Sequence, residues 1–256
     1  MRKKVDIIVS CYNEEDNVLP FYNETKKYLN DEKYHYNIVY VNDGSTDKTY
    51  ENVVNLKEQV NKESNIDISI ISFEKNFGHE SAMCAGFDMS NASYLIFMDV
   101  DLQNPPSKIT EILKKFEEGA DTVLLRRVKY NSASFMKKMF SKGYYLFSSI
   151  VLRNKNARDV SDFFAVDKNV AEKVRTNYRT TLRFVRSFVQ TEAKSIKFVN
   201  YENGARNSGV SRYNFWKLSK LAITSELSRI KFLREKYKET DDNKIYMIDK
   251  EKTFYC

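Results

Sequence analysis

The chain has 256 residues, 42% of them hydrophobic, which is enough for one large α/β domain with a substantial core. Its formal net charge of +7 and its pI of about 9.0 favour anionic partners such as a nucleotide, a lipid phosphate or a membrane surface. The three cysteines are widely spaced and form neither a zinc pattern nor a disulfide framework, and no stretch reaches the roughly 18 apolar residues of a membrane span.

Strands and helices alternate over the first half of the chain. Apolar runs predict strands at residues 5–10, 37–42, 67–73, 94–98 and 121–126. Helical periodicity and start signals predict helices at residues 15–30, from about 45 to 62, at 79–90 and from the proline pair 105–106 onward. This alternation predicts a mostly parallel sheet with helices on both faces.

Two basic amphipathic stretches follow, at residues 132–152 and 213–237. In both, apolar residues recur at helical spacing among several Lys and Arg residues. The pattern suits packing against the sheet, and it also suits contact with a membrane surface. Residues 231–256 form a charge-rich tail with a short apolar piece at 245–248, and we expect part of this tail to be disordered.

The end of the fourth strand carries the most informative polar residues. Asp99 and Asp101 follow the apolar run one residue apart, and Gln103 comes two residues later. Carboxylates at the carboxyl end of a parallel strand lie where open α/β sheets bind ligands. Their oxygens, with the amide oxygen of Gln103, suit a divalent cation such as Mg²⁺ or Mn²⁺, which could in turn hold a diphosphate. A solvated turn is the alternative, because Asp is common in turns.

Other candidate binding residues follow other strands. Asp43 ends the second strand before a Gly-Ser-Thr turn, where its carboxylate could accept N–H donors from a nucleobase or could cap an Asx-turn. Tyr12 follows the first strand and could equally be a core residue. Four arginines lie downstream in two pairs, 183 with 186 and 206 with 212, and the planar donor fork of arginine suits phosphate groups.

A set of short motifs is spread along the chain. They are SCYNE at residues 10–14, VNDGSTD at 41–47, NFGHESA at 76–82, MDVDLQNPP at 98–106, SDFF at 161–164, RFVR at 183–186 and RNSGVSRY at 206–213. Together they resemble family 2 glycosyltransferases, most closely the dolichol-phosphate mannose synthase-like branch with its bacterial polyprenyl-phosphate glycosyltransferases. The resemblance covers roughly residues 5–225. It implies a Rossmann-like GT-A fold, with one domain over residues 1–230 that divides into a nucleotide-sugar half at 1–104 and an acceptor half at 105–230.

The resemblance also implies roles for particular residues. Recognition of the nucleotide of a UDP- or GDP-sugar would fall to Tyr12, Glu14, Asp43, Gly78 and Asp99. The Mg²⁺ or Mn²⁺ ion that neutralises the diphosphate leaving group would be bound by Asp99, Asp101 and Gln103. Contacts to phosphate groups of donor or acceptor would come from Arg183, Arg186, Arg206 and Arg212. Asp162 could orient the acceptor or act as base, or it could make only a structural hydrogen bond. Ser10 stands where the family usually has Pro, a departure that does not remove a ligand.

We therefore expect a metal-dependent, inverting glycosyltransferase whose acceptor is a polyprenyl phosphate. The oxygen of such an acceptor is already anionic at neutral pH, so no strong general base is required. A saccharide or protein hydroxyl would need a carboxylate base, for which Asp162 is the candidate. A soluble glycosyltransferase of that second kind, in cell-surface glycan synthesis, and a non-catalytic sugar-nucleotide binding protein both remain open.

Two further expectations concern what the chain lacks. A dinucleotide-dependent oxidoreductase would carry G-x-G-x-x-G after the first strand, and residues 10–14 contain no glycine. The first strand, interrupted by Asp6, is too short for a signal peptide. We expect a cytoplasmic enzyme at the inner face of the cell membrane, with no nucleic-acid partner.

Overall fold

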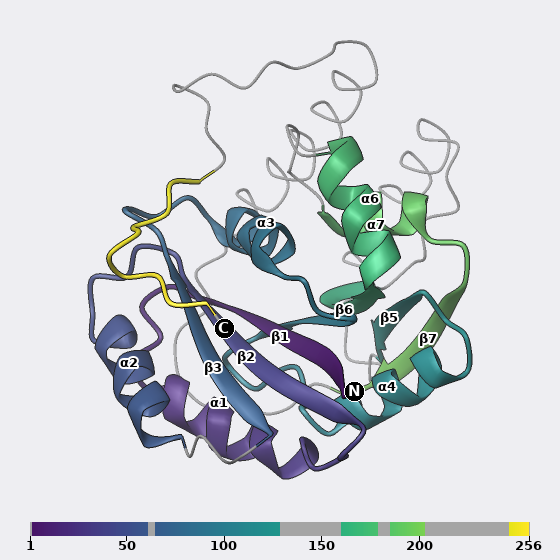
Figure 1. Cartoon of the computed structure of the whole chain (residues 1–256), viewed down its shortest axis with the longest axis horizontal. Coiled ribbons are helices and arrows are strands. Elements are labelled where there is room, and N and C mark those ends of the chain that lie inside the picture. Colours follow the sequence, from purple (N-terminus) through teal and green to yellow (C-terminus); the bar gives the residue numbers. More distant parts are fainter. Residues whose placement is uncertain (1, 61–64, 129–159, 179–184, 203–245, 256) are drawn as a thin grey trace, which may run out of the picture.

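The computed structural model describes residues 2–60, 65–128, 160–178, 185–202 and 246–255 (Figure 1). The strands are β1 (Lys3–Cys11), β2 (Tyr34–Asn42), β3 (Ile66–Ser72), β4 (Tyr94–Asp99), β5 (Thr122–Arg127), β6 (Val160–Asp167) and β7 (Ile196–Tyr201). The α-helices are α1 (Val18–Thr25), α2 (Thr49–Gln59), α3 (His79–Met89), α4 (Lys108–Glu117), α6 (Lys168–Tyr178) and α7 (Val185–Glu192), and a short 3₁₀ helix, η1 (Lys26–Tyr28), follows α1.

The described strands form one sheet in the order β3-β2-β1-β4-β6-β5-β7. β1 pairs in parallel with β2 and β4, β2 pairs in parallel with β3, and β5 pairs in parallel with β7. Among these strands only β6 is antiparallel to its neighbours, which are β4 and β5. The order of the strands reverses between β1 and β4. Open α/β sheets bind ligands at the carboxyl ends of the strands beside such a reversal.

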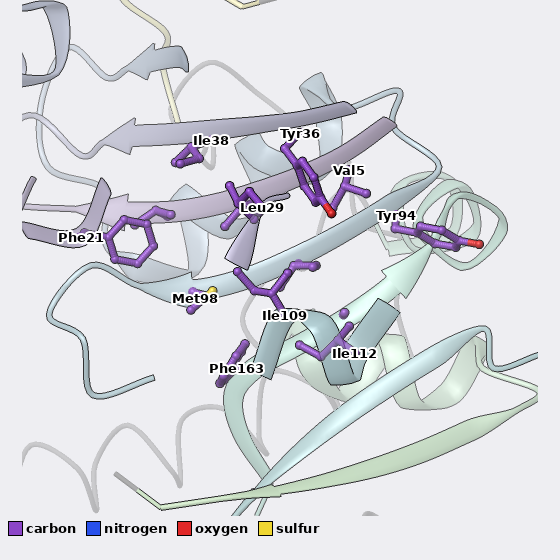
Figure 2. Close-up of a cluster of buried hydrophobic side chains, with 14 of the residues drawn as sticks. Val5, Phe21, Leu29, Tyr36, Ile38, Tyr94, Met98, Ile109, Ile112 and Phe163 are labelled. Atoms are coloured by element: carbon purple, nitrogen blue, oxygen red, sulfur yellow. The ribbon is translucent and has the colours of Figure 1, made fainter. Parts of the chain in front are cut away.

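Helices cover both faces of the sheet, so the central strands are apolar on both sides. On one face, α1, α2 and α4 contribute to a core in which Phe21 and Ile109 join Val5 of β1 (Figure 2). On the other face, α3, α6 and α7 contribute to a second core, in which Val174 joins Ile8 of β1. Side chains of a strand alternate between its faces, and each fully buried aliphatic or aromatic residue contributes about 1.5–3 kcal/mol to folding.

The predicted strands are all present, and their bounds differ from the prediction by at most three residues. The α/β class with a mostly parallel sheet is therefore confirmed. The first predicted helix is shorter than expected, because α1 ends at Thr25 and η1 follows it. The proline pair does not lie inside α4: the amides of Lys108 and Ile109 donate to the carbonyl oxygens of Pro105 and Pro106 at 3.1 and 3.0 Å, which forms a turn ahead of the helix.

Residues 246–255 are the part of the charge-rich tail that the structure describes. They lie along β3 and form backbone bridges with it. The physical reason is that Tyr246, Ile248 and Tyr255 are partly buried against the core on the α3 face. These three side chains remove enough apolar surface from water to hold the segment in place.

Several predicted features lie outside the described residues. They are the amphipathic stretches at 132–152 and 213–237 and the side chains of Arg183, Arg206 and Arg212. Over the part of the chain that the structure describes, the helices are all too short or too polar to cross a membrane.

Candidate active site at the carboxyl ends of β1 and β4

The site lies where the strand order reverses. Ser10 of β1 is paired in register with Asp99 of β4, so the loops that leave these two strands start side by side. The loop after β2 is adjacent, because Asn42 is paired with Cys11. The motifs at residues 10–14, 41–47 and 98–106 therefore meet at one edge of the sheet.

The loops after β1 and β2 are joined by hydrogen bonds. The amide of Asn13 donates to Ser45 Oγ at 3.0 Å, and the amide of Thr46 donates to Asn13 Oδ1 at 2.8 Å. Asn13 has φ of 54°, a left-handed conformation that Asn tolerates better than most residues. Glu14 accepts from Asn17 Nδ2 at 2.6 Å at the start of α1. Tyr12 is 36% exposed, which argues against a position in the core.

Asp43 is buried and connects β2 to the loop that precedes α3. Its carboxylate accepts from the amides of Phe77 and Gly78 at 2.6 and 2.8 Å, and from Asn76 Nδ2 at 3.0 Å. Burial raises the pKa of Asp43, and the two amide hydrogen bonds partly oppose that rise. The motif at 76–82 is therefore held at the site by Asp43, a contact that the sequence did not reveal.

Gly44 allows the same loop to approach closely. It has φ of 64°, and a Cβ atom placed there would lie 2.3 Å from the carbonyl carbon of Lys75. Gly78 has φ of 98° and ends the loop immediately before α3. Both glycines adopt backbone angles that other residues rarely adopt. Only at Gly44 would an added side chain also clash with a neighbouring backbone.

His79, the first residue of α3, lies inside the site. Its Nδ1 is 2.7 Å from Ser10 Oγ and 4.0 Å from Asp99 Oδ1. Burial lowers the pKa of His79, but nearby carboxylates, led by Asp99 and Asp162, outweigh that effect, so the pKa is raised. The sequence predicted only that a helix begins at this residue. Its place in the 76–82 motif was the one available signal for a larger role.

Asp99 is oriented by a residue that the sequence analysis did not single out. Asn104 Nδ2 donates to Asp99 Oδ2 at 3.0 Å, and the hydroxyl of Tyr201 in β7 donates to Asn104 Oδ1 at 3.3 Å. Burial raises the pKa of Asp99; His79 opposes this rise, and Asp162 and Asp101 add to it. Asp101 Oδ1 accepts from the amide of Gln103 at 3.1 Å.

Asp162 reaches the same site from β6. Phe97 is paired with Phe164 in the antiparallel β4–β6 ladder, and continuing this register by two residues brings Asp162 beside Asp99. Arg186 of α7 donates to Asp162 Oδ1 at 2.9 Å and to the carbonyl oxygen of Val160 at 2.9 Å. Two residues that the sequence placed in separate motifs are thus an ion pair at the edge of the site.

Three carboxylates contribute to the electrostatics of the site. Asp162 and Asp101 both raise the pKa of Asp99, and Arg186 pairs with Asp162. No three carboxylate, thiol or imidazole groups of the described residues form a complete cation site. A cation bound to Asp99 and Asp101 would therefore need further oxygen ligands, which the amide of Gln103 and a diphosphate could supply.

Solved structures with a similar fold are glycosyltransferases. Glucosyl-3-phosphoglycerate synthase from Mycobacterium tuberculosis, in complex with Mn²⁺, UDP-glucose and phosphoglyceric acid, aligns with a TM-score of 0.59 and 15% identity over 92% of this chain and 81% of that one. TarS 1–349 from S. aureus, in complex with UDP, aligns with a TM-score of 0.54 and 16% identity over 88% of this chain and 65% of that one. The chain therefore has the GT-A fold of glycosyltransferases, as the sequence predicted.

Sequence comparison gives the family. The family described as "Glycosyl transferase family 2" matches residues 6–175. An uncharacterized glycosyltransferase of Synechocystis sp. is 30% identical over 87% of this chain and 68% of its own length. A bactoprenol glucosyl transferase of Shigella phage SfV is 30% identical over 86% of this chain and 70% of its own length. The chain belongs to glycosyl transferase family 2 and is a glycosyltransferase.

Proposed function

We propose that the enzyme transfers a sugar from a UDP- or GDP-sugar to a polyprenyl phosphate at a membrane surface. The observation that carries the donor half of this proposal is the meeting of Asp99, Asp101 and the 76–82 motif at the point where the strand order reverses. The acceptor half is supported by the similarity to bactoprenol glucosyl transferases over 220 residues, because bactoprenol is a polyprenyl lipid.

Asp99, Asp101 and Gln103 are the residues that would hold a divalent cation. Their oxygens are of the hard type that Mg²⁺ and Mn²⁺ prefer, and the mutual repulsion of the carboxylates is relieved by positive charge. When bound, such an ion supplies Lewis-acid stabilisation of the departing diphosphate. Asn104 assists by fixing the orientation of the Asp99 carboxylate, since a second partner positions a ligand more narrowly.

Tyr12, Glu14, Asp43 and Gly78 are proposed to form the nucleoside side of the donor site. Tyr12 offers an exposed ring. Asp43 already accepts from the amides of Phe77 and Gly78, so its contribution includes holding that loop in place as well as any direct contact with the base. Glu14 would combine its hydrogen bond from Asn17, at the start of α1, with a contact to the ribose.

The arginines are proposed to bind the acceptor phosphate. Arg186 lies beside Asp162 at the rim of the site, and the sequence places Arg183, Arg206 and Arg212 in the motifs that resemble acceptor-binding segments. The pairing of Asp162 with Arg186 favours a positioning role for Asp162 over general-base catalysis, because the carboxylate already accepts a hydrogen bond from the guanidinium. A phosphate acceptor does not need that base.

Turnover with defined acceptors tests the proposal. Purified enzyme would be incubated with UDP-glucose or GDP-mannose, Mn²⁺ and undecaprenyl phosphate in detergent, and a glycosylated lipid is the expected product. A thermal-shift panel of UDP, GDP, CDP and dTDP, with and without Mn²⁺, would identify the nucleotide. Transfer to a soluble saccharide or protein, with none to the lipid, would overturn the acceptor assignment and make Asp162 the candidate base. Nucleotide binding with neither transfer nor donor hydrolysis would indicate a non-catalytic binding protein.

Replacement of Asp101 tests the cation. Asp101→Ala removes one carboxylate ligand, so we expect Mn²⁺-dependent UDP binding, measured by calorimetry, to be lost while the melting temperature stays within a few degrees. Glu118→Ala is the matched control, because Glu118 is a surface carboxylate paired with Lys115 and remote from the site. Undiminished turnover in excess chelator would contradict the cation assignment.

A further inference from the structure

The segment at residues 246–255 closes the outer edge of β3. It forms antiparallel bridges at Ile70 with Phe254 and at Phe73 with Ile248 (Figure 1, yellow beside β3). The backbones of Ile70 and Phe254 exchange two hydrogen bonds of 2.7 and 2.8 Å. The Phe254 end therefore lies toward the middle of β3, and the other end lies at the carboxyl end of β3, beside the candidate active site.

Two tyrosines attach the segment to the rest of the fold. The hydroxyl of Tyr255 donates to the buried carboxylate of Asp6 in β1, which also accepts from Ser90 Oγ at 2.6 Å. Burial and the Asp6 carboxylate raise the pKa of Tyr255, so its hydroxyl remains a donor at neutral pH. The hydroxyl of Tyr246 donates to Asp88 in α3. The segment thus bridges β3, β1 and the helix that leaves the site.

A chain of aromatic contacts runs from this segment to the donor-site loop. The ring of Tyr246 stacks on Phe73, with ring centroids 5.1 Å apart and planes at 8°. Phe73 meets Phe77 edge to face, with centroids 5.9 Å apart. The amide of Phe77 in turn donates to Asp43 at 2.6 Å. Displacing Tyr246 would remove the support on one side of Phe73 and so loosen the residues that Asp43 holds.

We propose that the 246–255 segment positions the loop at residues 73–79 for binding of the nucleotide diphosphate, with Tyr246 as the positioning residue. The inference rests on the proposed function, because that loop carries Gly78 and His79 into the donor site. Tyr246 acts on the loop through the rings of Phe73 and Phe77.

Protection of an edge strand is the simpler role for such a segment, because an unpaired edge invites pairing with another chain. The two roles can be separated, since the segment contacts β3 at two places. Phe254 pairs with Ile70 in the middle of β3. The residue is 48% exposed, and the centroid of its ring lies 6.0 Å from the Lys57 ammonium. Tyr246 covers the end beside the loop. If Tyr246 positions the loop, its replacement should alter the donor site and replacement of Phe254 should not. If the segment only protects the edge, the two replacements should have similar effects.

The experiment compares Tyr246→Ala, Tyr246→Phe and Phe254→Ala in the full chain. Tyr246→Ala is expected to speed hydrogen exchange of the Phe77 and Gly78 amides and to raise the dissociation constant of UDP with Mn²⁺ by about three- to tenfold, the range of an aromatic pair. Tyr246→Phe keeps the stacked ring, so its amide exchange rates and its dissociation constant for UDP should both stay close to those of the wild type. Phe254→Ala should lower the melting temperature without changing either value.

Two outcomes would overturn the inference: equal exchange of the Phe77 and Gly78 amides in wild type and Tyr246→Ala, or equal changes from Tyr246→Ala and Phe254→Ala. Failure of the proposed function is distinguishable from both. A wild-type chain that binds no nucleotide would reject the donor site, while the exchange comparison, which needs no nucleotide, would still decide whether Tyr246 holds the loop.

Discussion

At the scale of single residues, a carboxylate of the candidate site accepts hydrogen bonds from the backbone of a neighbouring loop. Asp43 accepts from consecutive amides at residues 77 and 78, and Asp121 does the same at residues 194 and 195. Asp121 lies at the start of β5, far along the sheet from β2. Asp43 and Asp121 therefore make the same kind of contact in two places, and only Asp43 is at the candidate site.

Replacement of Asp43 should weaken donor binding. Asp43→Ala removes the carboxylate proposed to accept a hydrogen bond from the base, and a hydrogen bond to a charged group is worth about 1.5–3 kcal/mol, so we expect the affinity for UDP to fall by an amount in that range. Isothermal titration calorimetry with Mn²⁺ gives the measurement. Asp121→Ala is the control, and it should reduce the free energy of unfolding without altering UDP affinity. An unchanged dissociation constant in Asp43→Ala would assign Asp43 to loop structure alone.

Replacement of Gly44 should destabilise the protein. Gly44→Ala should lower the free energy of unfolding by about 2–3 kcal/mol, because the new Cβ would meet the Lys75 backbone at 2.3 Å in a left-handed conformation. Gly119→Ala separates these two causes, because Gly119 has φ of 86° but open space around it. We expect a loss of about 1 kcal/mol there, from strain only. Equal losses in urea unfolding would show that the close contact is unimportant.

At the scale of elements, the antiparallel strand β6 brings the two halves of the site together. It is inserted between β4 and β5, and its register with β4 carries Asp162 toward Asp99. The described part of α7 then supplies Arg186 to the same carboxylate. β6 and α7 thus add the Asp162–Arg186 ion pair to a candidate site otherwise built from β1, β2 and β4.

Arg186 should matter more for transfer than for donor hydrolysis. In Arg186→Ala the acceptor phosphate loses a charge-assisted partner and Asp162 is left unpaired, so we expect the KM for undecaprenyl phosphate to rise by about tenfold. Hydrolysis of the donor by water should change much less. Lys168→Ala, on α6, controls for loss of one surface charge. Equal losses in transfer and hydrolysis would place Arg186 at the donor instead.

At the scale of the whole molecule, the positive charge is the property most relevant to a lipid acceptor. With a net charge of +7, we expect an attraction to anionic membranes that does not depend on a spanning helix. Each Lys or Arg close to an anionic leaflet contributes about 1 kcal/mol, and salt screens this attraction.

Vesicle flotation measures this property directly. We expect the protein to float with phosphatidylserine-containing vesicles at low salt and to be released at high salt, because the attraction is electrostatic. Vesicles of phosphatidylcholine alone are the control and should retain little protein at either salt concentration. Binding that is equal on both vesicle types, or insensitive to salt, would indicate apolar insertion rather than attraction between charges.

Much of this protein was determined by its sequence alone. The strands from β1 to β5 are apolar runs bounded by turn residues, and such local patterns do not depend on distant partners. The positions of Asp43, Asp99 and Asp101 after those strands follow directly, because parallel strands present their carboxyl ends at one edge. The family resemblance added the expected fold, and both the fold and the family were confirmed.

Tertiary structure alone decided the contacts between segments that are distant in the sequence. Asp43 meets Phe77 and Gly78, Asp162 meets Arg186, and the 246–255 segment pairs with β3. None of these has a local signal, since each depends on which strands are neighbours and in which register they pair. A shift of one residue in that register would turn every side chain to the opposite face. The sequence therefore determined which chemical groups stand at the strand ends, whereas the packing of the sheet decided which of them meet.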